Sequence, residues 1–266
     1  MRSGWNADAL ARRLAEWRPG ARVVCFDRIE STNDKALELL EAGEPEGTLV
    51  VADEQTRGRG RRGRSWHSPA GLGLYVSFVL RPSLAPADAP LVSLTLAVAV
   101  AEAIVGLGCD KVRLKWPNDI LIGSRKVGGI LAEARGDPGR TGLIAGLGLN
   151  VNHTAGDFPE ELAGNSTSLR LSTGHSWDRM RWLSDLLSRF EQGYGALQRR
   201  GAGEMLATFE RLMSFTRGAG VRIESGGEVR QGRFAGLGSA GELLLDTGSG
   251  KILSCRFGDV QCARMR

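Results

Sequence analysis

A run of alternating glycines and arginines lies between two segments of strand character. It is Gly58-Arg59-Gly60-Arg61-Arg62-Gly63, flanked by Arg57 and Arg64. Glycines let backbone N–H groups approach an anion closely, and guanidinium groups pair with phosphate oxygens in a bidentate way. The pattern therefore indicates a site for a polyphosphate or an acyl phosphate.

The same run satisfies the G-x-G-x-x-G fingerprint of dinucleotide-binding loops, but its context does not. Such a loop opens a helix whose N-terminus receives the pyrophosphate, whereas Ser65-Trp66-His67-Ser68-Pro69 follows here without helical periodicity. The sequence also has no G-x-x-x-x-G-K-[ST] segment. Two readings stay open for the loop: a nucleotide site, or a solvated arginine-rich loop that could contact RNA.

A second cluster of polar residues follows at Lys115-Trp116-Pro117-Asn118-Asp119, and then at Lys126-Val127-Gly128-Gly129-Ile130-Leu131. Pro117 lacks a backbone donor and ends a strand, so Asn118 and Asp119 are expected on a turn at the strand end. Asp119 can hold Mg²⁺, and Lys126 can bind a carboxylate or a phosphate. Singly, each is more often a plain turn or surface residue, but their succession favours a site.

Hydrophobic periodicity predicts the elements that position these clusters. Helices are expected at 5–18, from Ser31-Thr32-Asn33 to Gly43, at 91–106, at about 180–197 and at about 203–213. Strands are expected at Val23–Phe26, Thr48–Ala52, Leu74–Leu80, 112–116, 128–134 and 142–149. From Gly218 onward, short alternating segments separated by glycines predict a small all-β unit, with a boundary near residue 216.

Composition indicates a globular protein: 42% of the 266 residues are hydrophobic and 24% are charged. Five of the 35 basic residues lie between positions 57 and 64, so the net charge of +5 indicates a local anion site more than a nucleic-acid-binding face. Four scattered cysteines match neither a zinc site nor a disulfide scaffold. With no signal-peptide pattern and no apolar run of membrane length, we expect a cytoplasmic protein.

Several of these segments, taken in order and at their spacing, resemble the biotin protein ligase family. They are Ser31-Thr32-Asn33, the run from Gln55 to Trp66, Lys115–Asp119, Lys126–Leu131 and Gly146–Val151, and the resemblance covers roughly residues 23–266. It implies an α+β catalytic domain at 1–216, with a mixed sheet flanked by helices as in class II synthetases and biotin or lipoate ligases. Residues 1–22 would be a helical extension, and 217–266 a small SH3-like β-barrel.

The resemblance also implies the reaction and its participants. The enzyme would form biotinyl-5′-AMP and pyrophosphate from biotin and ATP with Mg²⁺. It would then transfer biotin to a lysine of the biotin carboxyl carrier domain of acetyl-CoA carboxylase or a related carboxylase, forming a C–N bond.

Site residues are carried over in the same way. Ser31, Thr32 and Gln55 would hydrogen-bond the ureido ring of biotin, and helix N-capping by the first two is compatible with that role. The full set for biotin is Ser31, Thr32, Asn33, Gln55, Arg59, Gly60, Arg61, Lys126 and Gly129. The set for ATP and the adenylate is Arg59, Arg61, Arg64, Trp66, Asn118, Lys126 and Asn150. The catalytic set is Lys126, Arg59, Arg61 and Asp119, with Asp119 also the expected Mg²⁺ ligand.

Two alternatives remain. A lipoate or octanoate ligase or transferase shares the catalytic fold but lacks this arginine and glycine loop, and a protein of another class could bind nucleic acid through Arg57–Arg64. Regulatory members of the resembled family carry an N-terminal DNA-binding winged helix, whereas only about 22 residues precede the first matching strand here. We therefore expect a ligase without operator binding, either a monomer or a homodimer.

Overall fold

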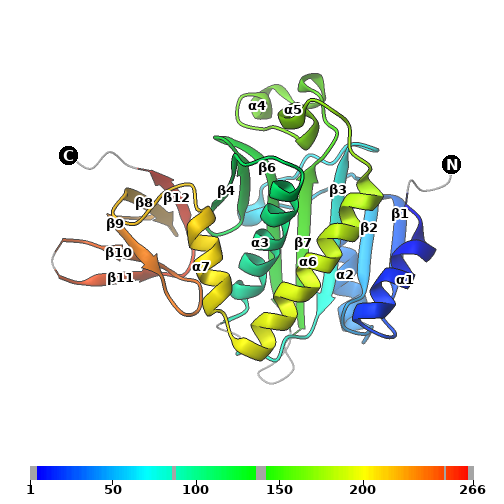
Figure 1. Cartoon of the computed structure of the whole chain (residues 1–266), viewed down its shortest axis with the longest axis horizontal. Coiled ribbons are helices and arrows are strands. Elements are labelled where there is room, and N and C mark those ends of the chain that lie inside the picture. Colours follow the sequence, from blue (N-terminus) through cyan, green and yellow to red (C-terminus); the bar gives the residue numbers. More distant parts are fainter. Residues whose placement is uncertain (1–4, 86–87, 136–141, 249, 263–266) are drawn as a thin grey trace.

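The computed structural model describes residues 5–85, 88–135, 142–248 and 250–262. Within these ranges the chain forms a seven-stranded main sheet and a separate five-stranded sheet. Helices pack on the main sheet, and the second sheet lies at one end of the molecule (Figure 1).

The main sheet is mixed, which confirms the expected fold class. Its spatial order is β1-β2-β3-β7-β6-β5-β4. The β1–β2 pair is parallel and the other neighbours are antiparallel. The strands are β1 (Val23–Ile29), β2 (Leu49–Gln55), β3 (Gly73–Leu80), β4 (Val112–Lys115), β5 (Asp119–Ile122), β6 (Arg125–Arg135) and β7 (Gly142–Asn150).

The two faces of the main sheet are covered by different helices. On one face, Ala36 and Leu40 of α2 (Thr32–Glu41) pack against Val50, Val79 and Ile144. Neighbouring strand residues point to the opposite face because side chains alternate along a strand. That face is covered by α3 (Pro90–Gly106) and α6 (Arg179–Arg200), with α1 (Ala7–Trp17) and α7 (Gly203–Leu212) beside them.

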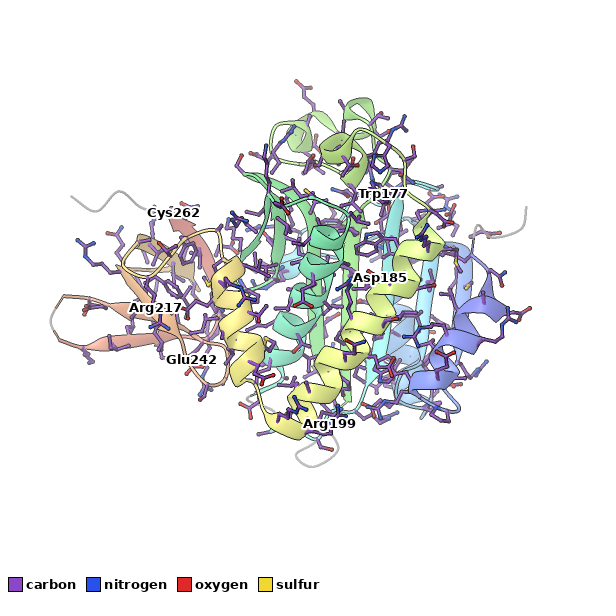
Figure 2. All side chains as sticks on the ribbon, in the orientation of Figure 1. Trp177, Asp185, Arg199, Arg217, Glu242 and Cys262 are labelled. Carbon is purple, nitrogen blue, oxygen red and sulfur yellow. The ribbon has the colours of Figure 1, made fainter. Side chains whose placement is uncertain are left out.

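The helix α3 is apolar on nearly all sides because it lies between the sheet and α6. Its first residue is Pro90, whose fixed φ suits the first turn of a helix. By contrast, α6 buries only one side, and its outer side carries Asp185 and Arg199 (Figure 2). Among the described residues, no helix is both long and apolar enough to cross a membrane.

Short elements connect β7 to α6. They are the 3₁₀ turn η3 (Ala155–Asp157), α4 (Glu160–Ala163) and α5 (Leu169–Thr173). Figure 1 shows α4 and α5 beyond the end of the main sheet. The sequence did not predict them, because segments of this length show no clear periodicity.

The five strands after Gly218 form an antiparallel sheet in the order β11-β10-β9-β8-β12. We call this part, Gly220–Cys262, the C-terminal β domain; it agrees with the expected small all-β unit. The Trp116 indole donates a hydrogen bond to the Gly241 carbonyl (2.9 Å) and so ties the domain to the main sheet. The strands are β8 (Gly220–Ser225), β9 (Glu228–Leu237), β10 (Leu243–Asp246), β11 (Ile252–Cys255) and β12 (Asp259–Cys262).

Some sequence predictions were wrong in detail. Asp119 was expected on a turn, but it is the first residue of β5 and pairs with Lys115 of β4. Pro117 does interrupt the strand, and the chain reverses there into a tight hairpin. Strands β5, β9 and β12 were not predicted, and β6 begins at Arg125 instead of residue 128.

We expect Phe190→Ala to lower the free energy of unfolding by about 3–5 kcal/mol, because it leaves a cavity in the packed aromatic layer. The Phe190 ring is fully buried, with its centroid 4.9 Å from Phe78 and 5.9 Å from Trp17. Urea unfolding followed by circular dichroism measures the change. The control Val105→Ala, at a side chain 41% exposed, should change stability by less than about 0.5 kcal/mol; equal effects would contradict this packing.

Candidate functional site

A glycine-lined floor lies beneath the start of α2, on the face of the main sheet that this helix covers. Beyond Ile144, the next two residues of β7 that point to this face are Gly146 and Gly148. A Cβ on Gly146 would lie 1.9 Å from Asn33 Oδ1, and one on Gly148 would lie 2.3 Å from the Trp66 indole nitrogen. Both positions therefore need glycine, because polar and aromatic groups occupy the space above them.

This floor, together with the side chains around it, forms what we call the inner pocket. Its free volume is about 50 Å³, well below the roughly 300 Å³ at which ligand pockets begin. The Trp66 ring and the Lys126 ammonium line it, and each comes within 3.3 Å of a Cβ built on Gly129. A ligand must displace these side chains or lift the loop above them.

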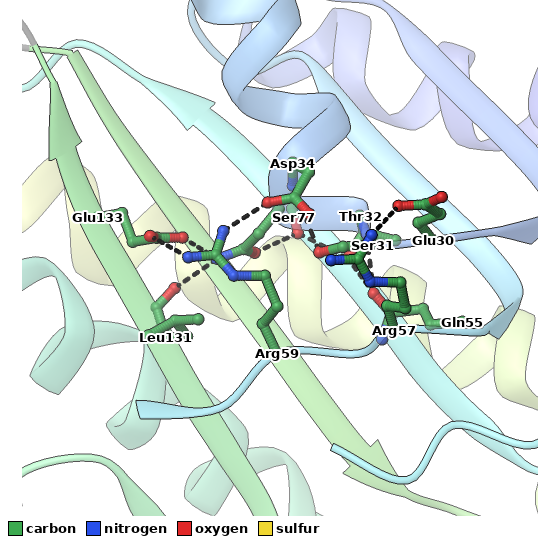
Figure 3. A network of polar contacts seen from close by, with 11 residues as sticks. Glu30, Ser31, Thr32, Asp34, Gln55, Arg57, Arg59, Ser77, Leu131 and Glu133 are labelled. Carbon is green, nitrogen blue, oxygen red and sulfur yellow. Dashed lines mark hydrogen bonds and ion pairs between the residues drawn. The ribbon is translucent and has the colours of Figure 1, made fainter. Parts of the chain in front are cut away.

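Hydrogen bonds connect the start of α2 to the strands beneath it (Figure 3). Ser31 caps the helix by accepting from Asp34 N, and Thr32 donates from both its backbone N–H and its hydroxyl to Gln55 Oε1 (2.8 and 3.0 Å). The buried Ser77 hydroxyl lies 2.8 Å from the Thr32 hydroxyl and 2.6 Å from Asn33 Oδ1. The donors and acceptors that line the inner pocket are thus fixed before any ligand arrives.

Glu133 connects this network to the arginine and glycine loop. Its carboxylate accepts from Asn33 Nδ2 at 3.0 Å and from Arg59 at 2.7 Å, and Arg59 also donates to Asp34 at 2.5 Å (Figure 3). Burial alone would lower the pKa of Arg59, but the hydrogen bonds to Asp34 and Glu133 outweigh it and raise that pKa. Arg59 is therefore held firmly as a cation over the pocket.

The other end of the loop is attached to the C-terminal β domain. Arg62 and Arg64 donate to the same carboxylate oxygen of Asp259 at 3.0 and 2.6 Å, and Arg62 also donates to the Glu224 carbonyl. Arg62 has φ +56°, and in the described ranges it alone among non-glycine residues has a positive φ. This costly backbone conformation is held by the contacts on both sides of it.

Arg61 differs from the other four arginines of the loop. Arg57 pairs with Glu30, and Arg59, Arg62 and Arg64 pair with carboxylates as described above. Arg61 instead donates to the neutral amide oxygen of Asn118 at 2.8 Å. Burial lowers its pKa, although a guanidinium stays charged at any relevant pH. Its positive charge is therefore the one in the loop most available to a ligand.

Lys126 and Asp119 lie next to this arginine. Their charged groups are 2.6 Å apart, and the Lys126 nitrogen lies 5.4 Å from the centroid of the Trp66 ring. The backbone of Lys126 is fixed by a hydrogen bond from its N–H to Asn165 O and by another from Thr167 N–H to its carbonyl. This places a lysine at the border between the inner pocket and its neighbour.

That neighbour, the side pocket, has a volume of about 260 Å³. It shares Gly60, Arg61, Trp66, Asn118 and Lys126 with the inner pocket. Its own lining includes Arg64, Asp119, Asn150, Phe158, Asn165 and Ser166.

Two of these lining residues are held from behind. Asn150 is buried and donates to the Thr167 carbonyl at 3.0 Å, which positions the connection after β7. The Phe158 ring stacks on the fully buried His153 ring at a centroid distance of 5.1 Å. Phe158 and Asn150 thus form fixed walls of the side pocket, and Arg61 and Lys126 place positive charge at its border with the inner pocket.

The structure brings all the sequence-predicted residues to one place. Trp66, expected in the set for ATP and the adenylate, lines both pockets. The residues that sequence reasoning missed are Asp34, Ser77, Glu133, Phe158 and Asp259. Ser77 gave a signal, a polar residue within the apolar run Leu74–Leu80. The acidic residues gave none, because their arginine partners lie far away in the sequence.

Asp119 does not form a metal site by itself. In the described ranges, no group of three or more His, Cys, Asp or Glu side chains could hold a metal ion, and Asp119 is already paired with Lys126. Mg²⁺ commonly binds one or two carboxylates together with substrate phosphates. The protein side chains alone thus do not complete a magnesium shell.

Comparisons with known proteins show which family the chain belongs to. Residues 25–152 match the model of the Biotin/lipoate A/B protein ligase family. The bifunctional ligase/repressor BirA of Bacillus spizizenii is 38% identical over 234 residues, which cover 87% of this chain and 71% of that protein. The chain belongs to the biotin protein ligase family. Another similar protein, the biotin--[acetyl-CoA-carboxylase] ligase of Paracoccus denitrificans, is 34% identical over 84% of this chain and 94% of its own length.

The fold of this chain is also similar to that of a solved biotin protein ligase. The biotin protein ligase of Aquifex aeolicus, in complex with biotin and ATP, superimposes with a TM-score of 0.76 at 32% identity. The alignment covers 91% of this chain and 99% of that one.

We expect Asp259→Asn to loosen the loop, because Arg62 and Arg64 lose their shared carboxylate. Two exposed ion pairs together contribute about 1 kcal/mol, which corresponds to about a fivefold rise in trypsin cleavage within residues 57–64. Mass spectrometry of the fragments measures it. Glu228→Gln, which removes the Arg230 ion pair in the same domain, is the control, and a similar rise there would show that Asp259 does not anchor the loop.

We also expect His153→Gln to reduce the acid sensitivity of folding. Burial, and secondly the nearby His67, lower the pKa of His153 from 6.5 to about 4. Between these values the unfolded chain binds a proton that the folded chain does not, so stability falls as pH falls. The stability advantage of wild type over the variant should shrink by on the order of 3 kcal/mol from pH 7 to pH 4.

Denaturant unfolding at a series of pH values measures this difference. The exposed His175→Gln serves as the control and should keep the wild-type pH dependence. A constant difference between wild type and His153→Gln would contradict the assignment to His153.

Proposed function

We propose that this chain activates biotin with ATP and then joins it to a lysine of a biotin carboxyl carrier domain, as its relatives' names imply. The observation that carries the proposal is the meeting of two pockets at Lys126 and Arg61. One pocket is narrow, glycine-floored and lined by preset hydrogen-bonding groups, and the other is larger and has a cationic border.

The inner pocket suits the fused rings of biotin. A ureido group has one carbonyl acceptor and two N–H donors, so it needs both kinds of partner in a dry site. Thr32 and Gln55 supply hydroxyl and amide groups that are already hydrogen-bonded to each other, and the buried Ser77 hydroxyl holds Thr32 in place. Gly146 and Gly148 carry no side chains, so a flat ring that displaces the Trp66 indole would lie directly on the sheet.

The first reaction joins two anions. The biotin carboxylate oxygen attacks the α-phosphorus of ATP, the bond from that phosphorus to the bridging oxygen breaks, and pyrophosphate leaves with the electron pair. Catalysis of such a step is mainly a matter of positioning and of neutralising charge. Lys126 and Arg61 lie at the border of the two pockets, where the carboxylate and the phosphate would meet.

The second reaction consumes the mixed anhydride. A neutral lysine amine attacks the acyl carbon, a C–N bond forms, and AMP leaves with the electrons of the broken C–O bond. A lysine amine is ordinarily protonated at pH 7, so a proton must be removed. We assign Asp119 as its acceptor, because its carboxylate becomes free when Lys126 turns toward the phosphate.

Magnesium would enter with the nucleotide. Asp119 is the described carboxylate nearest to Lys126, and phosphate oxygens and water would have to supply the other ligands. When bound, the ion would offset phosphate charge.

The alternative functions fit the site less well. The names of the relatives favour biotin over lipoate. A nucleic-acid-binding role needs guanidinium groups that are free to meet a phosphate backbone, whereas four of the five loop arginines are paired with carboxylates. We place the reaction in the cytoplasm, where the four free cysteines would stay reduced.

We expect Lys126→Ala to slow biotinyl-AMP formation by about 10²–10³-fold, because one preorganised cation is lost from the transition state. Pyrophosphate release, with mass-spectrometric detection of biotinyl-AMP, measures the step. The control Lys111→Ala, at an exposed lysine, should retain the wild-type rate. Normal turnover in Lys126→Ala would remove Lys126 from the site, and calorimetric binding of lipoate with no heat from biotin would reverse the assignment of the substrate.

A further inference from the structure

Three cavities meet at one hydrogen bond. The inner pocket and the side pocket both include Arg61 and Asn118, whose side chains are joined at 2.8 Å. A third cavity of about 400 Å³, which we call the outer cavity, includes the same two residues. Its lining residues come from the main sheet, the N-terminal end of α3 and the C-terminal β domain.

Near the site, the walls of the outer cavity are apolar. Leu94 of α3, Trp116 and Leu143 of β7 are buried there, and Ala132 and Ala134 of β6 contribute small side chains. Walls of this kind exclude water and accept a methylene chain. The cavity is therefore suited to the stem of a long side chain whose tip is polar.

The rim of the outer cavity has a different chemistry and belongs to the C-terminal β domain. Glu242, Arg256 and Phe257 line it, and Figure 2 labels Glu242 beside α7. Phe257 is 64% exposed, the highest value for a large hydrophobic side chain in the described ranges. Aromatic and arginine side chains are both enriched at protein interfaces.

Contacts fix the rim relative to the site. The Trp116 indole donates to the Gly241 carbonyl at 2.9 Å, and a Cβ built on Gly241 would lie 2.6 Å from Leu94 Cδ1. Gly241 also has φ +80°, which disfavours other residues. These contacts hold Gly241, and with it the adjacent Glu242, against Trp116 and Leu94 in the cavity wall.

The reaction needs three reactants at one point. If biotin occupies the inner pocket and the nucleotide the side pocket, the acyl carbon of the adenylate lies near Arg61 and Asn118. We propose that the outer cavity admits the acceptor lysine, and that Phe257 and Arg256 dock the folded carrier domain that presents it. This inference rests on the proposed function and adds to it the route of the third reactant.

The apolar walls also serve the chemistry of transfer. The attacking amine must be neutral, and burial among apolar groups disfavours a charged ammonium. The released proton then moves to Asp119, as proposed above, while the C–O bond to AMP breaks. A folded carrier would seal the cavity mouth and exclude water, which otherwise hydrolyses the anhydride.

Comparing transfer to a carrier domain with transfer to a small nucleophile distinguishes a defect in docking from a defect in the chemistry. We expect Phe257→Ser to raise the KM for a biotin carboxyl carrier domain of acetyl-CoA carboxylase about tenfold, the loss typical of an interface hot spot. Biotin-dependent pyrophosphate exchange, and the reaction of the adenylate with hydroxylamine, should stay at the wild-type level, because neither needs docking.

A second variant, Ser93→Trp, fills the outer cavity from α3 and should slow carrier transfer in the same selective way. Val229→Ser is the matched control, since Val229 is 47% exposed on β9 and does not line the cavity; it should leave all three reactions unchanged. Thermal melts verify that each variant is folded.

The outcomes are distinct. An unchanged KM for the carrier in both Phe257→Ser and Ser93→Trp, with normal adenylate formation, overturns the inference and leaves the proposed function intact. An equal loss of hydroxylamine transfer also overturns it, because the defect then lies in the chemistry. Failure of the wild-type protein to form any biotinyl-AMP overturns the proposed function and the inference together.

Discussion

Pairing between carboxylates and arginines keeps the cationic loop against the sheet, and the pockets of the site depend on it. Asp34 and Glu133 hold one end of the loop and Asp259 holds the other. Five guanidinium groups within eight positions would otherwise repel one another. Because four are neutralised locally, an incoming phosphate meets a loop that is already ordered, with Arg61 as its available charge. The free energy needed to order these charges is supplied when the protein folds, before the ligand binds.

The C-terminal β domain takes part in the site. It supplies the Asp259 carboxylate, the Glu224 carbonyl that accepts from Arg62, and the Gly241 carbonyl that accepts from Trp116. These contacts reach the loop on one side and the strand end before Asn118 on the other. Geometry at the border of the pockets thus depends on residues more than a hundred positions away in the chain.

The sequence predicted the parts of this arrangement that are local. Period-two and helical patterns identified most main-sheet strands and the long helices, and the spacing of the glycines, arginines and Lys126 indicated an anion site. The roles assigned to single residues, and the boundary near residue 216, stay predictions. Strands β5, β9 and β12 were missed because they are short or carry polar residues on the exposed side. Glu133 and Asp259 were missed because a single acidic residue in a sequence does not reveal that it pairs with an arginine 74 or 195 positions away.

The floor beneath Asn33 and Trp66 limits how this enzyme could be redesigned. Its space comes from missing side chains at Gly146 and Gly148, so substitution there can only take space away. An engineer seeking to accommodate bulkier vitamin analogues would gain nothing from the floor and would have to trim the surrounding walls. The sheet therefore sets a fixed lower boundary of the pocket. A change in ligand preference requires substitutions among the side chains above it.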